Sequence, residues 1–83
     1  MAIYREYDVV RVVRLLTTKR EFSGTDGVKR APQVGDTATI VHLYEINNPT
    51  ATVVAESVNS NGNTIWLADF QPDELELVSR RGP

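Results

Sequence analysis

Apolar residues recur along the chain in five short segments, and turn-forming residues separate each segment from the next. Within each segment apolar and polar side chains alternate or nearly alternate, as in a strand with one face buried. The segments are rich in Val, Ile, Thr and aromatic residues, which favours extended structure over helix. We predict strands over residues 7–16, 36–44, 50–58, 64–70 and 75–79.

The first of these segments, residues 7–16, is the least regular. Four of its apolar residues also fit the spacing of one face of a helix, namely Val9, Val12, Val13 and Leu16. The density of β-branched valine nevertheless favours a strand. Because apolar residues fall on both faces, we expect the strand to be partly covered on its second face or bent near residues 11–13.

The connections between the segments carry turn signals of different strength. Asn61-Gly62 is the clearest hairpin signal, because both residues tolerate the positive φ that tight hairpins need. Residues 45–49 end in Asn-Asn-Pro and predict a turn, and residues 71–75 predict one helical turn that starts at Pro72. Residues 17–35 form a long connection, in which a small hairpin turning at Gly24–Gly27 would place Phe22 opposite Val28.

The chain is long enough for one domain only, which we assign to residues 1–83 with a tail at 80–83 that we expect to be frayed. Five strands at this spacing favour an all-β meander over residues 7–79 that closes on itself as a barrel. Closure would remove the free sheet edges through which small open sheets aggregate.

The composition excludes several classes of site and setting. With no cysteine the chain cannot hold a disulfide scaffold, a thiolate nucleophile or a Cys-ligated metal, and it suits a reducing cytoplasm. Residues 1–6 lack the basic-then-apolar pattern of a signal peptide, and no apolar run approaches the roughly 20 residues that span a bilayer. We therefore expect a cytoplasmic protein without a membrane partner.

The net charge of −2 is unevenly distributed along the chain. Residues 1–35 hold seven Lys and Arg against four acids, whereas residues 36–83 hold two Arg against seven acids. Such an imbalance could create a basic face for nucleic acid or an acidic partner. Alternatively, strands from the two halves pair side by side and their charges neutralise each other.

The order of the elements resembles that of SH3-like barrels, with a long loop after the first strand and a helical turn before the last. The chain is also similar to a family of small bacterial proteins known only as a domain of unknown function. The shared features are a Tyr-Asp-Val-Val start at residues 7–10, a Gly-Asp step at 35–36, the strand 39–44 and a Pro-Asp-Glu-Leu-like ending at 72–78. The resemblance covers about residues 7–78 and implies a five-stranded SH3-like barrel in a bacterial cytoplasm, with no catalytic residue to carry over.

Acidic and imidazole side chains offer little catalytic potential. His42 is the only histidine, and a metal site would require carboxylate partners that its strand does not supply on the same face. The acids at 69, 73, 74 and 76 could bind a cation or act as acid and base, but capping and solubility are the simpler roles. Glu56 lies on an otherwise apolar face and predicts an ion pair with Arg11 or Arg14.

Aromatic and basic residues are the remaining candidates for binding. The side chains of Tyr4, Tyr7, Tyr44 and Trp66 could form an aromatic platform, or could instead fill the core of a small barrel. The long loop combines Phe22 with basic residues, a pattern that suits nucleic acid but also suits a solvated loop. The candidate partner-binding residues are Tyr44, Trp66, Phe22, Arg20, Lys29 and Arg30.

These patterns predict a non-enzymatic interaction module, without cofactor or metal, that binds a protein partner or a second copy of itself. The alternative is a nucleic-acid-binding module that uses residues 17–33 with Arg11 and Arg14. A small enzyme or metal-binding protein built on His42 and the acids is the third reading.

Overall fold

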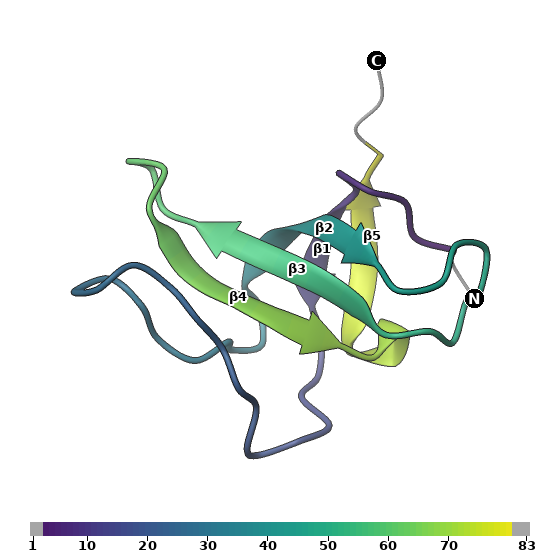
Figure 1. Ribbon diagram of the computed structural model, residues 1–83, viewed down its shortest axis with the longest axis horizontal. Coiled ribbons are helices and arrows are strands. Elements are labelled where there is room, and N and C mark those ends of the chain that lie inside the picture. Colours follow the sequence, from purple (N-terminus) through teal and green to yellow (C-terminus); the bar gives the residue numbers. More distant parts are fainter. Residues whose placement is uncertain (1–2, 81–83) are drawn as a thin grey trace.

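The computed structural model of the protein describes residues 3–80 (Figure 1). Five antiparallel strands form one sheet, and a single 3₁₀ turn precedes the last strand. The elements are β1 (Val9–Val12), β2 (Thr37–Leu43), β3 (Val53–Val58), β4 (Thr64–Phe70), η1 (Pro72–Glu74) and β5 (Leu75–Ser79). The predicted all-β class, the five strands and the helical turn are confirmed.

The first strand is shorter than predicted, and the competing helix over residues 9–16 does not form. Tyr7 adopts a φ of 71°, which breaks the extended backbone before Val9. After Val12 the backbone N–H groups of Val13 and Arg14 both donate to the carbonyl of Glu74, so the chain turns onto η1. The sheet therefore receives only the middle of the apolar segment.

The strand order is β4-β3-β2-β1-β5, which leaves β4 and β5 at the two edges. No ladder joins these edges among residues 3–80, so the predicted closure into a barrel is not seen in the strand pairing. Register shifts interrupt the β2–β3 and β1–β5 ladders, and such bulges bend a sheet. In Figure 1, β1 and β5 accordingly run in a direction that crosses the one shared by β3 and β4.

Alternate residues of the strands face a common core. Trp66 and Phe70 of β4 form its largest part, with ring centroids 5.2 Å apart, and the rest is mostly aliphatic. The other buried hydrophobic residues of this core are Tyr4, Val10, Val12, Ala38, Ile40, Val53, Ala55, Ala68 and Leu75. Burying this set from water is the main stabilising contribution to the fold.

The long loop after β1 lies along the outer edge of β4. Ser23 and Leu67 exchange two backbone hydrogen bonds of 3.1 and 2.8 Å, and Arg30 N donates to Ile65 O at 3.1 Å. The turn expected near Gly27 is present, because the N–H groups of residues 28 and 29 donate to Thr25 O. The loop nevertheless pairs with β4 rather than with itself, since Ser23 is matched to Leu67 in place of the predicted pairing of Phe22 with Val28.

The first and last described residues meet beside β5. The Arg80 guanidinium lies 3.2 Å from Asp8 Oδ2 and also donates to Ile3 O at 3.1 Å. Tyr4 Oη donates to Leu75 O at 2.9 Å. Arg80, the start of the predicted frayed tail, is therefore held by contacts, and residues 81–83 lie outside the described part of the chain.

Candidate functional site

Trp66 belongs to the core and not to a binding surface. Its side chain is fully buried, and its indole N–H donates to Asp36 Oδ2 at 2.8 Å. Tyr4 is also buried, with 7% of its surface exposed. The aromatic residues singled out from the sequence therefore divide between the core, which holds Tyr4 and Trp66, and the surface, which holds Tyr7 and Tyr44.

Arg20 is taken up by an internal ion pair. Its guanidinium lies 2.5 Å from Glu74 Oε2 and 4.3 Å above the ring of Phe70. Burial by itself would raise the pKa of Glu74, but hydrogen bonds from Arg20 and from the N–H groups of Leu16 and Gln71 lower that pKa below its usual value. The pair fixes the start of the long loop onto η1 and leaves Arg20 little surface for a ligand.

The other basic loop candidates also have acidic partners. Arg30 binds the carboxylate of Asp36 with two hydrogen bonds of 2.8 and 3.0 Å, and Lys29 lies 3.5 Å from Asp26. Burial tends to raise the pKa of Asp36, but hydrogen bonds from Arg30, Trp66 and the Gln33 N–H lower it overall. Arg30 thus supports the same carboxylate that holds Trp66 in place.

The ion pair predicted for Glu56 is not formed. Its carboxylate accepts a hydrogen bond of 2.6 Å from Thr64 Oγ1 on the neighbouring strand. Arg11 instead pairs with Glu76 at 3.0 Å, and Arg14 donates to the Asp73 carbonyl. The register places Glu56 opposite Leu67 and Thr39, away from both arginines, and a hydroxyl satisfies the carboxylate instead.

His42 is exposed and packs against Tyr44 in an edge-to-face arrangement with ring centroids 5.1 Å apart. Within residues 3–80 no group of three or more His, Asp or Glu is placed to hold a metal ion. The same part of the chain contains no helix of the length and apolar character needed to cross a membrane.

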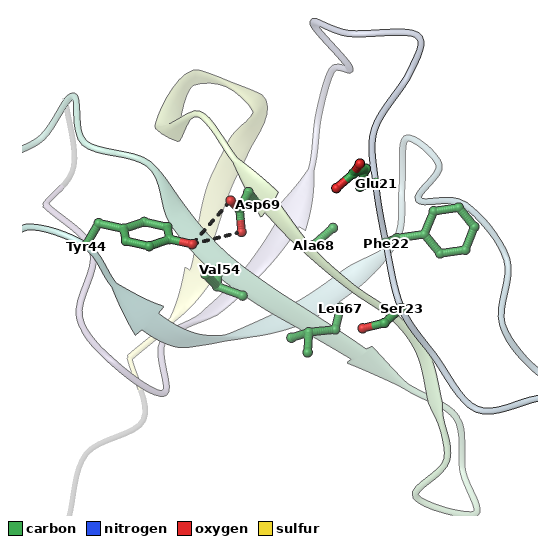
Figure 2. Close-up of a pocket in the computed structure, with 8 residues that line it drawn as sticks. All are labelled: Glu21, Phe22, Ser23, Tyr44, Val54, Leu67, Ala68 and Asp69. Carbon is green, nitrogen blue, oxygen red and sulfur yellow. Dashed lines mark hydrogen bonds between the residues drawn. The ribbon is translucent and has the colours of Figure 1, made fainter.

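Tyr44 and Phe22 are the two sequence candidates that border one hollow. An open groove with a cavity volume of about 540 Å³ lies between the loop at residues 21–23 and the side chain of Tyr44. Figure 2 shows the residues that line it. Its floor includes the half-buried side chains of Val54 and Leu67 on the outer face of β3 and β4. The groove is lined by Glu21, Phe22, Ser23, Tyr44, Val54, Leu67, Ala68 and Asp69.

Strand register explains how the far wall of the groove is built. Asp69 of β4 lies directly opposite Val54 of β3, so both side chains stand on the outer face. Tyr44 follows the end of β2, and its hydroxyl donates to Asp69 Oδ2 at 3.3 Å. The negative charge of Asp69 raises the pKa of Tyr44 above its usual value, so this phenol remains a hydrogen-bond donor at neutral pH.

The near wall depends on the path of the long loop. The Ser23–Leu67 bridge places Glu21 and Ser23 beside β4, where Figure 2 shows the Glu21 carboxylate on the side of the loop that faces Asp69. The Phe22 ring, however, points away from Tyr44 on the opposite side of the loop. Sequence analysis missed Glu21, because nothing in its local sequence indicates that the loop crosses β4 at this point. It also missed Ser23, Val54, Leu67 and Ala68 as lining residues.

No protein-family model, curated protein or solved structure matches this chain. Function is therefore inferred from the chemistry of the groove. The groove combines an exposed aromatic ring, an apolar floor and two carboxylates.

Proposed function

We propose that the protein is a non-enzymatic interaction module that binds a polypeptide partner in the groove between residues 21–23 and Tyr44. The observation that carries this proposal is the position of Tyr44. This residue is 56% exposed beside the half-buried Val54 and Leu67, and Tyr flanked by apolar surface is typical of the residues that dominate protein interfaces.

The remaining candidates support the same site by elimination. Trp66 is buried, and Arg20, Lys29 and Arg30 each lie beside a carboxylate. The basic loop that would have favoured nucleic acid is therefore largely neutralised, and the chain carries a net charge of −2. The proposal includes a bacterial cytoplasmic setting, which rests on the sequence resemblance and on the absence of cysteine.

The proposal can be tested by selecting ligands from a random peptide library against the immobilised full-length chain. A selected peptide is then titrated into ¹⁵N-labelled protein, and the shifted amide signals are assigned. We expect the shifts to centre on residues 21–23, 44, 54 and 67–69. Tyr44→Ser should weaken binding about tenfold, the loss of a moderate interface anchor.

Tyr7→Ser is the matched control, because Tyr7 is also exposed but does not line the groove. A selection that yields no ligand, or ligands whose shifts map elsewhere, would overturn the proposal. Sedimentation velocity of the unliganded chain distinguishes self-association from binding of a separate partner. If the unliganded chain dimerises through the same residues, the occupant is a second copy and the claim of a separate partner fails.

A further inference from the structure

Resting on the proposed function, we infer that the occupant of the groove is a basic segment in extended conformation, with one Lys or Arg side chain between Glu21 and Asp69. Three features of the groove lead to this partner class. They are its uncompensated negative charge, the exposed ring of Tyr44, and the backbone groups of Asp69, which are unpaired among the described residues at the outer edge of β4.

The charge of the groove is negative on both walls. Among residues 3–80 the ion pairs involve Asp8, Asp26, Asp36, Glu74 and Glu76, and neither Glu21 nor Asp69 has a basic partner. None of the described Lys, Arg or His residues lines the groove. Two carboxylates beside a common hollow repel each other, and a cation bound between them would relieve that repulsion.

The aromatic side chain adds a second preference for a cation. Tyr44 presents an exposed ring at the edge of the groove, and a Lys or Arg head group over such a face gains a cation–π attraction. The rings of His42 and Tyr44 pack edge to face, and the Tyr44 hydroxyl is hydrogen-bonded to Asp69. The ring and one carboxylate are thus held together before any ligand arrives, which lowers the cost of ordering them on binding.

The free edge of β4 explains why the ligand should be extended. At the outer edge of β4 the carbonyl of Ile65 and both backbone groups of Leu67 are hydrogen-bonded to the loop. Every second residue of an edge strand directs its N–H and C=O outward, so the next residue to do so is Asp69. No hydrogen bond from the described residues reaches the Asp69 backbone on that side. An added peptide can pair with this step, as in β-strand addition, while its side chains reach the groove.

The test uses a capped lysine–threonine repeat peptide as the probe and a glutamine–threonine repeat of equal length as its neutral counterpart. Both are titrated into the ¹⁵N-labelled full-length chain at low salt. We expect the lysine peptide to shift the groove signals and to slow hydrogen exchange of the Asp69 amide. Its affinity should fall as salt rises, because the attraction is between charges.

Glu21→Gln and Asp69→Asn should each weaken binding of the lysine peptide about threefold, the effect expected for removing one partner of an exposed charge pair. Glu6→Gln and Asp26→Asn remove the same charge from exposed sites outside the groove and should change the affinity less than twofold. Equal loss in the control variants would mean that only the overall charge is sensed, and would overturn the inference.

The outcomes separate this inference from the proposed function. If the neutral peptide, or a library-selected peptide without Lys or Arg, binds the groove as tightly, the basic partner is wrong while the interaction module stands. If the lysine peptide shifts the groove but leaves exchange at Asp69 unchanged, the extended pairing is wrong. If no peptide of any composition binds the groove, the proposed function itself fails.

Discussion

The carboxylate of Glu74 is fully buried, yet its surroundings satisfy it completely. It accepts hydrogen bonds from the Arg20 guanidinium, from Leu16 N and from Gln71 N. A buried charge of this kind stabilises a fold only when paired, and removal of one partner is costly. Glu74 therefore acts as a junction at which the loop after β1 is joined to η1, rather than as a ligand for an external group.

The depressed pKa of Glu74 makes this junction dependent on pH. Because the folded pKa lies below the usual value of 4.5, the ionised form stabilises the fold above that pH, and the stabilisation is lost as the pH falls through the folded pKa. We expect Glu74→Gln to lower the free energy of unfolding at pH 7 by about 2 kcal/mol, so that the variant unfolds at a lower urea concentration than the natural protein. The difference should shrink steadily below pH 4.5.

Urea unfolding at several pH values measures this difference. Glu6→Gln serves as the control, because that carboxylate is exposed and has no ion pair among the described residues. Acidic groups common to both proteins cancel in the comparison. A difference that stays constant down to pH 3 would show that the charge of Glu74 does not contribute.

Among the elements, the loop after β1 is the one that most affects the edges of the sheet. It covers the outer edge of β4 from Thr64 to Leu67 and so blocks pairing with another chain along that stretch. Its close approach requires Gly24, since a Cβ there would lie 2.8 Å from Ile65 O and 2.6 Å from Lys29 Cβ. The same approach places Glu21 beside the groove.

We expect Gly24→Ala to push the loop away from β4 and to destabilise the protein by about 1–3 kcal/mol. Hydrogen exchange of the Leu67 amide, which donates to Ser23 O, should accelerate, and the exposed edge should promote concentration-dependent association. Ser23→Ala is the control, because it alters an exposed side chain and keeps the backbone bridge. Unchanged exchange at Leu67 in Gly24→Ala would contradict this account.

Local signals in the sequence were sufficient to predict the five strands, but not the ends of β1 or the path of the loop. Alternation and the Asn61-Gly62 turn locate β3 and β4, where Gly62 has a φ of 83° and Asn59 N donates to Asn63 O. The loop path depends on hydrogen bonds to the β4 backbone, which any residue type can make and no motif records. Tyr44 could be predicted as a binding candidate from its residue type. The position of Glu21 beside the groove could not, because it depends on the path of the loop.

The whole molecule interleaves its two oppositely charged halves. Arg11, Arg20 and Arg30 of the first half pair with Glu76, Glu74 and Asp36 of the second, as the neutralising alternative predicted. The partners of Arg11 and Arg20 lie far away in the sequence, so only the arrangement of the strands brings them together. Arg30 and Asp36 are closer and lie on either side of the turn at Gly35. The composition therefore indicated a charge imbalance that the fold largely removes. The groove is one of the places where carboxylates without a basic partner remain among the described residues.

The two ends of the described chain are joined through Tyr4, whose hydroxyl donates to Leu75 O at 2.9 Å. Because β5 is an edge strand, this bond ties the N-terminal segment to the last strand of the sheet. We expect Tyr4→Phe, which keeps the buried ring, to lose about 1 kcal/mol in urea unfolding at pH 7. Tyr7→Phe removes an exposed hydroxyl that makes no hydrogen bond among the described residues, and it should leave stability unchanged.

Alkaline pH provides an independent check on the burial of the same hydroxyl. Burial, reinforced by the charges of Asp73, Asp8 and Glu76, raises the pKa of Tyr4 above its usual value of 10.0. The folded state therefore holds this proton more tightly than the unfolded state, and its stabilising effect is lost as the pH rises above 10.0. The difference in free energy of unfolding between the natural protein and Tyr4→Phe should narrow over that range, because only the natural protein has a phenol at position 4 to ionise. A difference that widens instead would show that the pKa of Tyr4 is not raised in the folded protein.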